Sequence, residues 1–181
     1  MAKLGFAVHA VDFNQQLLQE LRSNTKGLSV TVVEDEIINF LEHTALEAEV
    51  IVCMGDTLTH LQSIEQVEHA LLLAQKKLIR SGKLVLSFRD LTRKLVGEQR
   101  FIPVKSDDEK ILTCFLEYAP HRVMVHDILH EKINGVWHQR VSAYAKLRMD
   151  EAMIVGLLEK NGYRIASAQT IDRMIYLVAT T

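Results

Sequence analysis

The stretch FAVHAVDFNQQLLQELRSNTKGLSVTVVED, residues 6–35, decides the fold class of this chain. Its first apolar run, residues 6–11, predicts a β-strand that ends at Asp12, and leucines at helical spacing predict a helix over residues 14–22. A second apolar run, residues 28–33, predicts another strand that also ends in acidic residues. Strand, helix and strand in this order indicate a β-α-β unit with parallel strands.

The alternation of strands and helices continues toward the middle of the chain. Beyond the first unit we predict a short helix over 37–41, a strand over 50–54, a long helix over 64–79 and a strand over 83–88. Ser63, with Gln66 three positions later, predicts the start of the long helix as a capping box, and Ser81-Gly82 predicts its end. Strands that are apolar on consecutive positions are typical of a parallel sheet covered on both faces.

The second half of the chain changes to antiparallel strands. A helix with Asp150 as its N-cap and Asn161-Gly162 behind it is predicted over residues 151–160. The last two strands are too close in sequence for a helical crossover and therefore predict a closing hairpin. The strands predicted in this half are 101–104, 111–118, 122–129, 136–146, 163–168 and 174–180, with a turn at Asn134-Gly135.

Composition excludes several classes of protein. The 181 residues carry 21 Lys+Arg and 23 Asp+Glu, a net charge of -2, so we expect no nucleic-acid partner held by phosphate neutralisation. No run of about 18 apolar residues and no signal-peptide pattern is present, so we expect no membrane partner and a cytoplasmic location. Cys53 and Cys114 lie far apart in apolar runs, which fits a reducing compartment. The length fits one domain spanning residues 1–181.

The first residues predict that the chain begins inside a helix. Met1 to Leu4 have the pattern of a last helical turn, with Lys3 near the end and Gly5 in the position that follows. Because helices are rarely one turn long, we expect the earlier part of this element to be absent. A frayed N-terminal tail is the alternative.

Charged and turn residues follow each strand of the parallel part, at the sheet edge where open α/β proteins bind ligands. Asp12 is the candidate for binding the hydroxyls of a ribose, because an acidic residue at a strand tip commonly does so. A turn or helix-cap role fits the spacing of Asp12 equally well. The other strand-end residues are Glu34, Asp35, Gly55, Asp56, Arg89 and Asp90.

Three stretches carry a resemblance to a known family: VIVCMGDTLTHL at 50–61, GKLVLSFRD at 82–90 and NGYRIASAQ at 161–169. With the strand-end residues, they resemble a class I S-adenosylmethionine-dependent methyltransferase of the small-molecule type, over essentially the whole chain. The resemblance implies a Rossmann-like three-layer α/β/α sheet with a reversed C-terminal β-hairpin. It also implies an antiparallel β insert at 101–146, which would cover the substrate or form a dimer face.

The resemblance further implies the cofactor S-adenosylmethionine and a small-molecule methyl acceptor. Asp12 would hold the ribose hydroxyls, and Phe13 would lie beside the adenosine. Asp35 would accept a hydrogen bond from the adenine amino group, with the backbone of Glu36 close by. The backbone that would meet the methionine moiety belongs to Cys53, Met54 and Gly55.

One departure from the family is central. The family's first strand and its glycine-rich turn have no counterpart in this chain, and Gly5 is not that turn. The absent strand would lie between the predicted strands at 6–11 and 50–54. Its loss would leave two unsatisfied strand edges or bring those strands together. We therefore expect a domain truncated at its N-terminus, without the first βα unit, which a partner chain would rescue.

Two residues are candidates for catalysis. His60 follows the end of the third strand, close to where the methyl group would lie, and is the candidate general base. A histidine that bonds to the backbone at a helix entry is the alternative for His60. Arg89 either pairs with an anionic group of the substrate or pairs with Asp90.

The insert supplies candidate substrate contacts. With Asp56 and Asp90 we expect Tyr118 and Tyr144 to line the substrate site, and His126 and Trp137 are further candidates. The aromatic residues could equally form the core of the insert or a dimer face. His126 and His130 are four residues apart, but on a strand this places them about 13 Å apart, so we expect no metal site.

The leading hypothesis is therefore S-adenosylmethionine-dependent methyl transfer to a small molecule, impaired in this chain by the absent glycine motif. The alternative is a non-catalytic methyltransferase-fold remnant that acts through dimerisation, and a homodimer is expected in either case. A nicotinamide-dependent oxidoreductase rests on Asp12 alone, and the closing hairpin disfavours it.

Overall fold

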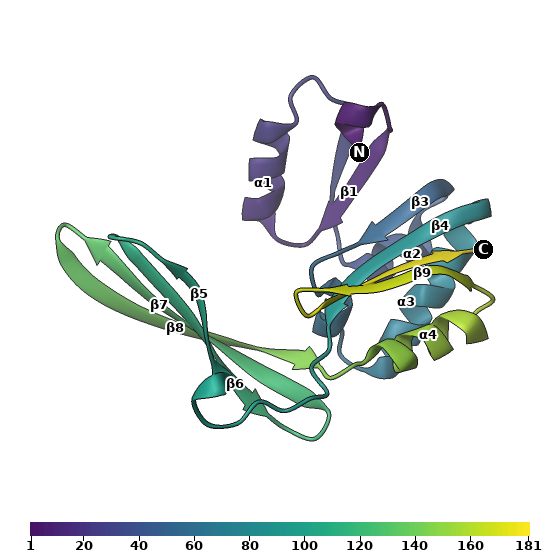
Figure 1. Ribbon diagram of the computed structural model, residues 1–181. Coiled ribbons are helices and arrows are strands. Elements are labelled where there is room, and N and C mark those ends of the chain that lie inside the picture. The colour runs from purple at the N-terminus through teal and green to yellow at the C-terminus, as the bar shows by residue number, and fades with distance from the viewer.

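A computed structural model describes residues 1–181, and its strands form three separate sheets. The first is the predicted β-α-β unit: β1 (Val8–Asp12) pairs in parallel with β2 (Val30–Glu34), and α1 (Gln15–Asn24) connects them. Asn14 begins α1 by accepting hydrogen bonds from two backbone N–H groups of the first turn. Figure 1 shows this N-terminal unit standing beside the main body of the molecule.

The main body contains a four-stranded sheet in the order β3-β4-β10-β9. β3 (Ala48–Cys53) runs parallel to β4 (Leu78–Arg89). β10 (Met174–Thr180) runs antiparallel to β4 on one side and to β9 (Arg164–Ile171) on the other. The reversed closing hairpin that the sequence predicted is confirmed.

Helices cover one face of this main sheet, and the core lies between the helices and the sheet. α3 (Ile64–Lys77) packs against α4 (Glu151–Lys160) and β4, whereas α2 (Ile37–His43) packs on α3. Along β10, Ile175, Leu177 and Ala179 are buried, but the residues between them are only half-buried. The apolar strand pattern predicted a sheet covered on both faces, whereas helices cover one face of this four-stranded sheet. No helix is both long and apolar enough to cross a bilayer.

The end of α3 differs from the prediction. The helix stops at Lys77, and the chain enters β4 at Leu78, before the predicted Ser81-Gly82 stop. Ser81 has a positive φ of 62°, and the pairing of β3 with β4 shifts register at this point. A Cβ at Gly82 would lie 2.8 Å from the carbonyl oxygen of Ile79. The Ser81-Gly82 pair therefore forms an irregularity inside a strand and not a helix stop.

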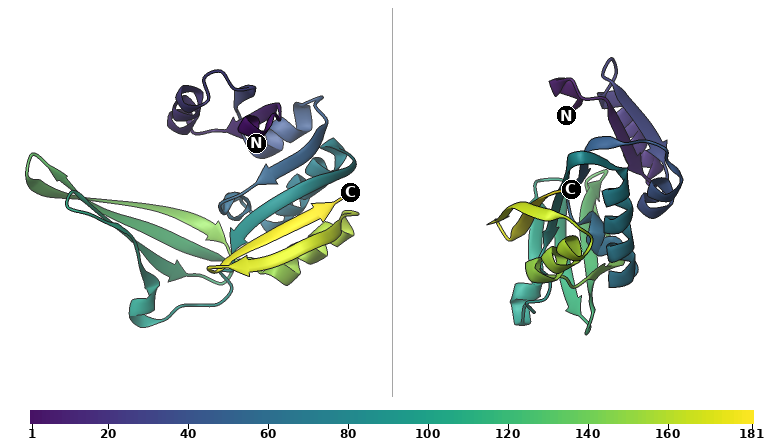
Figure 2. Two further views of the ribbon diagram at one scale, coloured as in Figure 1. Left: turned by 45° about the horizontal axis from the view of Figure 1, so that its top comes forward. Right: turned by 90° about the vertical axis from the view of Figure 1, so that its right-hand side faces the viewer.

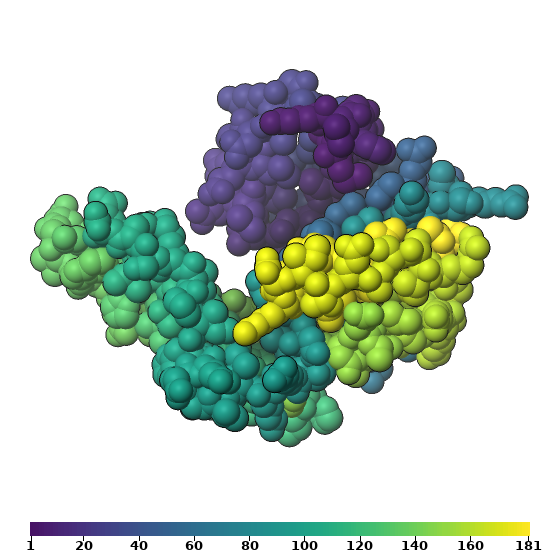
Figure 3. All heavy atoms as spheres, viewed as in Figure 1, coloured from purple at the N-terminus to yellow at the C-terminus, as the bar shows by residue number.

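The third sheet is the predicted antiparallel insert, here called the insert sheet. Its strands β5 (Phe101–Ser106), β6 (Lys110–Tyr118), β7 (Arg122–Ile133) and β8 (Val136–Leu147) pair in chain order. Asn134 and Gly135 both have positive φ, as a tight hairpin turn requires. The insert sheet projects from the main body as a long twisted arm (Figures 1 and 2), and with all atoms drawn its base touches the main body while its far end stands apart (Figure 3).

Register gives the insert sheet two distinct faces. Val123 pairs with Lys146 and Val125 with Tyr144, so these side chains share one face, the inner face, together with Tyr118. The opposite, outer face carries His126 and Trp137 among others. The substrate candidates from the insert are therefore divided between two faces.

Three short 3₁₀ turns complete the elements: η1 (Ala2–Leu4), η2 (Thr57–His60) and η3 (Gly97–Arg100). Gly5 ends η1 in the left-handed conformation, with φ of 91°, as the sequence predicted for a glycine after a helical turn. β1 and β3 do not pair with each other. Of the two outcomes expected for these strands, the structure shows two unpaired edges.

Candidate functional site

The carboxyl ends of β1, β2 and β3 carry the residues predicted to contact the adenosine and methionine parts of the cofactor. The backbone N–H of Asp35 donates to the carbonyl oxygen of Asp12 over 3.1 Å, so these two residues are immediate neighbours. Asp12 also lines the same cavity as Cys53 and Met54. The fold thus brings together the predicted adenosine and methionine contacts at one edge of the molecule.

Each of the two aspartates keeps a free carboxylate oxygen. Oδ1 of Asp12 accepts the backbone N–H of Asn14 at 2.8 Å, and Oδ2 has no hydrogen bond within the protein. Oδ1 of Asp35 accepts from the Glu36 backbone at 2.8 Å and from Asn39 Nδ2 at 2.7 Å, which also leaves Oδ2 free. Asp12 therefore has the turn role that the sequence also allowed, and this role occupies only one of its two carboxylate oxygens.

Other residues at this edge differ in their availability. Phe13 is 68% exposed, directly after Asp12, so its ring is open to a ligand. Glu34, in contrast, accepts a hydrogen bond from Gln15 Nε2 at 2.7 Å. Glu34 is thus tied to the first residue of α1, whereas Asp35 is tied to Glu36 and Asn39 at the start of α2.

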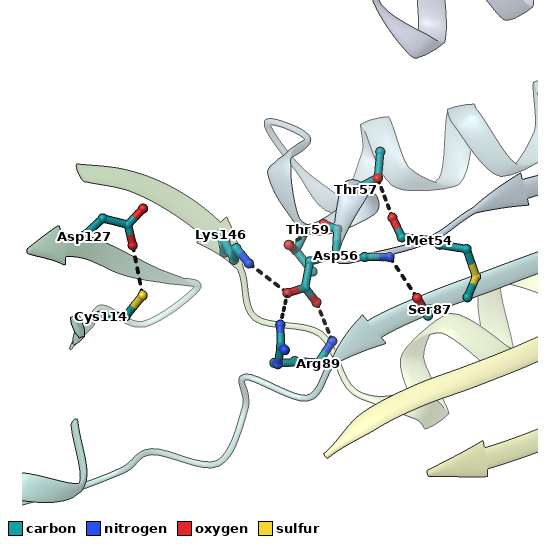
Figure 4. A network of polar contacts seen from close by, with 10 residues as sticks. Met54, Asp56, Thr57, Thr59, Ser87, Arg89, Cys114, Asp127 and Lys146 are labelled. Atoms are coloured by element: carbon teal, nitrogen blue, oxygen red, sulfur yellow. Dashed lines mark hydrogen bonds and ion pairs between the residues drawn. The ribbon is translucent and has the colours of Figure 1, made fainter. Parts of the chain in front are cut away.

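The turn after β3 is held tightly against β4. Gly55 and Asp56 both have φ of 74°, a left-handed pair that glycine adopts freely and aspartate tolerates. The Gly55 N–H donates to Ser87 Oγ at 2.8 Å, and the Thr57 hydroxyl donates to the Met54 carbonyl at 2.8 Å (Figure 4). The backbone proposed to meet the methionine moiety is thus fixed in place.

Asp56 is the centre of a buried ion network (Figure 4). It is 1% exposed, and its Oδ1 accepts the Arg89 backbone N–H at 2.7 Å. Its Oδ2 accepts from Arg89 Nη1 and from Lys146 Nζ, each at 2.8 Å. These donors occupy both oxygens, so Asp56 joins β3, β4 and β8 and is not exposed to a substrate.

The network also decides the partner of Arg89. The sequence left Asp90 or a substrate anion as alternatives, and the Asp90 alternative is wrong. Asp90 instead caps its own turn, accepting the backbone N–H of Thr92 at 2.8 Å. The Arg89 side chain is still 53% exposed, so its remaining N–H groups face solvent.

Burial and charge set the protonation of the groups near Asp56. Burial raises the pKa of Asp56, but the Lys146 and Arg89 donors outweigh it and hold that pKa below its usual range. Partial desolvation and then the positive charge of Lys146 lower the pKa of His60. Burial, with the nearby Asp127 carboxylate, raises the pKa of Tyr144 to about 12. His60 and Tyr144 are therefore both neutral at neutral pH.

His60 and Tyr144 come together from different parts of the chain. Their ring centroids lie 5.4 Å apart, and the imidazole makes no hydrogen bond to the backbone, which was the alternative for His60. Tyr118, on the same inner face, lies under the guanidinium of Arg148 at 5.7 Å. His126 and Trp137 face the other way, because side chains alternate along a strand.

Sequence reasoning missed Lys146 and Arg148. The sequence predicts Lys146 only as the last residue of a strand, although its two-residue spacing from Tyr144 places both on one face. Arg148 donates to the carbonyl oxygens of Leu91 at 3.1 Å and of Ala119 and Pro120 at 2.9 Å, and so fixes the base of the insert sheet. No local motif marks either residue.

Comparisons by sequence find no related protein, whereas comparisons by structure do. No protein-family model and no curated protein matches the sequence. Solved structures do match: the CcbJ methyltransferase from Streptomyces caelestis superposes with a TM-score of 0.85 at 17% identity, over 98% of this chain and 76% of that one. The chain has the class I methyltransferase fold.

Two further structures share this methyltransferase fold. The amino pentose methyltransferase CalS10 from Micromonospora echinaspora, solved with S-adenosylmethionine bound, gives a TM-score of 0.80 at 12% identity, over 98% of this chain and 75% of that one. An S-adenosylmethionine-dependent methyltransferase from Clostridium acetobutylicum gives 0.78 at 13% identity, over 95% of this chain and 74% of that one. At such identities the likeness establishes the fold alone.

Replacing Asp56 tests the ion network. Asp56→Asn leaves Lys146 partly buried without its counter-charge, so we expect the free energy of unfolding at pH about 7 to fall by about 3–5 kcal/mol. Because folding lowers the Asp56 pKa, its contribution is present above the ordinary carboxyl pKa of about 4 and is lost as pH falls through the lowered value. Urea unfolding should therefore show a smaller difference at pH about 3.

The control for this experiment is Asp108→Asn, an exposed carboxylate in the insert sheet that should change the free energy of unfolding by less than about 0.5 kcal/mol. Equal losses for the two variants, or a difference that does not shrink in acid, would contradict the assigned role of Asp56.

A second prediction concerns His60. An NMR titration should give His60 a pKa below the usual histidine range, and Lys146→Met should raise it because a nearby cation disfavours the imidazolium. Lys132→Met, on the outer face beside Trp137, is the matched control and should leave His60 unchanged. A His60 pKa that does not respond to Lys146→Met would show that the network does not reach the imidazole.

Proposed function

We propose that this chain transfers the methyl group of S-adenosylmethionine to a small molecule in the cytoplasm. The observation that carries the proposal is the pair of free carboxylate oxygens on Asp12 and Asp35. The two carboxylates lie at the carboxyl ends of β1 and β2, beside the exposed ring of Phe13, and His60 follows the carboxyl end of β3. The S-adenosylmethionine-bound CalS10 structure, of the same fold, supports the choice of cofactor. The free thiols of Cys53 and Cys114 fit a reducing compartment.

The residues at this edge fit the nucleoside part of that cofactor. Carboxylate oxygens accept hydrogen bonds from hydroxyl and amino groups, which suits Asp12 to the ribose and Asp35 to the adenine amino group. Phe13 offers an aromatic face for the base. The fixed backbone of Met54 and Gly55 would position the methionine part.

The acceptor side of the site lies between η2 and the inner face of the insert sheet. When bound, the cofactor supplies an activated methyl group on sulfur, and the protein must align the acceptor and take up a proton. His60 is neutral at neutral pH and has a free ring to accept that proton. Arg89 would orient a polar or anionic group of the acceptor through its exposed guanidinium edge.

Isothermal titration with S-adenosylmethionine tests this function. Asp12→Asn should weaken binding about 10- to 100-fold, because it removes hydrogen bonds to a charged group. Asp107→Asn is a matched control: this turn aspartate also accepts backbone N–H groups, from Glu109 and Lys110, but lies in the insert sheet. No binding by the unaltered chain, or equal weakening in both variants, would count against the proposal.

A second candidate function is self-association through the outer face of the insert sheet. This face exposes apolar side chains on neighbouring strands, with Trp137 45% and Val141 59% exposed. Further exposed apolar side chains on this face are Phe101, Ile111 and Met124. Exposed apolar patches of this kind mark interaction surfaces. The face lies on the side opposite Lys146 and Tyr144, so a second copy could cover it without blocking His60. A non-catalytic role through this dimer is the alternative to methyl transfer.

Light scattering tests this dimer. The unaltered chain should run as a dimer, and Val141→Asp should raise the dimer dissociation constant at least about tenfold, because a charge enters an apolar contact. Ser142→Asp is the neighbouring control, exposed on the inner face. A monomer at all concentrations, or the same effect from both substitutions, would argue against the outer face as a dimer contact.

A further inference from the structure

Asp127 of β7 is a carboxylate without a cationic partner in the protein. Register places it on the inner face of the insert sheet, opposite Cys114 of β6 and Ser142 of β8. Its Oδ1 accepts a hydrogen bond from the Cys114 thiol at 2.9 Å (Figure 4), and its Oδ2 has no hydrogen bond within the protein. The residue is half-buried, and a charge that is partly withdrawn from water is costly without a counter-charge.

Another carboxylate on the same strand and face does have counter-charges. Glu131, four residues along β7, forms ion pairs with Lys110 at 2.7 Å and with Arg140 at 3.5 Å. Lys146, which is also on the inner face, is bound to the Asp56 carboxylate at 2.8 Å. The cations of this face are therefore taken up elsewhere, and the charge of Asp127 is left for a ligand.

Two hydroxyl groups beside Asp127 are also without a partner. Ser142 lies directly opposite it, and Tyr144 is its diagonal neighbour, about 7–8 Å away between backbone positions. Neither hydroxyl makes a hydrogen bond within the protein. Burial and then the Asp127 charge raise the pKa of Tyr144, so the phenol oxygen lies within the field of that carboxylate. The carboxylate and the two hydroxyls together form one patch of acceptor oxygens.

Tyr144 separates this patch from the candidate base. Its ring centroid lies 5.4 Å from that of His60. The charge of Lys146 acts on His60, so the imidazole lies toward the Lys146 end of β8, whereas Asp127 lies opposite Ser142 farther along the same strand. A group bound at Asp127 is therefore held away from the proton acceptor.

We propose that Asp127 selects the methyl acceptor by binding an ammonium group that the acceptor carries away from its methylated atom. An ammonium brings a positive charge and three donors, which match one carboxylate and two hydroxyl oxygens. A neutral hydroxyl would leave the carboxylate charge uncompensated. Because a protonated nitrogen has no lone pair, this group is bound and not methylated. The inference rests on the proposed methyl transfer, since it concerns the acceptor of that reaction.

Two probe molecules test the ammonium site: tyramine and tyrosol, which carry an ammonium and a hydroxyl at the same position of one phenol frame. In an NMR titration of the full chain, tyramine should bind at least about tenfold more tightly, because its hydrogen bonds to Asp127 are charge-assisted at both ends. The shifted resonances should belong to Asp127, Ser142 and Tyr144. Equal affinity for the two probes, no binding of either up to about 10 mM, or shifts confined to other parts of the chain would overturn the inference.

Substitutions assign the preference to one carboxylate. Asp127→Asn should abolish the preference for tyramine, and Asp127→Glu, which keeps the charge, should retain part of it. Glu131→Gln is the matched control, because it removes the same charge four residues along the same face, and it should leave the preference unchanged. A preference that survives Asp127→Asn, or that Glu131→Gln removes equally, contradicts the role of Asp127.

Cofactor binding separates this inference from the proposed function. Asp127→Asn should leave the affinity for S-adenosylmethionine unchanged, because Asp127 lies on the insert sheet and Asp12 at the end of β1. A chain that binds S-adenosylmethionine but shows no preference for tyramine overturns the inference and keeps methyl transfer. A chain that prefers tyramine through Asp127 but does not bind S-adenosylmethionine keeps the ammonium site and overturns its role in selecting a methyl acceptor.

Discussion

The buried ion network of Asp56 determines how the parts of this molecule meet. One carboxylate, 1% exposed, binds the backbone and side chain of Arg89 at the end of β4 and the ammonium of Lys146 near the end of β8. A buried charge is costly unless it is paired and hydrogen-bonded, so the insert sheet has to present Lys146 at this point. Arg148 reinforces the same junction through backbone carbonyl oxygens. The proposed acceptor side of the site depends on this junction.

The same cation tunes the chemistry next to the junction. Lys146 neutralises Asp56 and, through its charge, disfavours the imidazolium form of His60. The docking of the insert sheet also brings Tyr144 to within 5.4 Å of the His60 ring, measured between centroids. The proposed acceptor side is therefore held by polar contacts inside the chain. The proposed nucleoside side contrasts with it, because Asp12 lies at the end of β1, whose second edge is unpaired.

The sequence predicted elements well where local signals decided them. The helix over 151–160 has the predicted bounds, because Asp150 caps it and Asn161-Gly162 ends it, and the Asn134-Gly135 turn sets the longest hairpin. The prediction failed at the end of α3, because Ser81-Gly82 serves equally well as a helix stop and as a strand irregularity. Pairing with β3 makes Ser81-Gly82 a strand irregularity, and the local sequence does not reveal that pairing.

What the sequence by itself determined is the order of strands and helices and the residues that follow each strand. Apolar runs end where charged and turn residues begin, which placed Asp12, Asp35 and His60 after the carboxyl ends of parallel strands. Only the tertiary structure decided the partners of those residues. Lys146 reaches Asp56 across 90 positions of sequence, and Asp90, next to Arg89 in the chain, does not pair with it. Such contacts depend on how the insert sheet is oriented relative to the main sheet. That orientation is set by buried charge and by packing between segments far apart in the sequence.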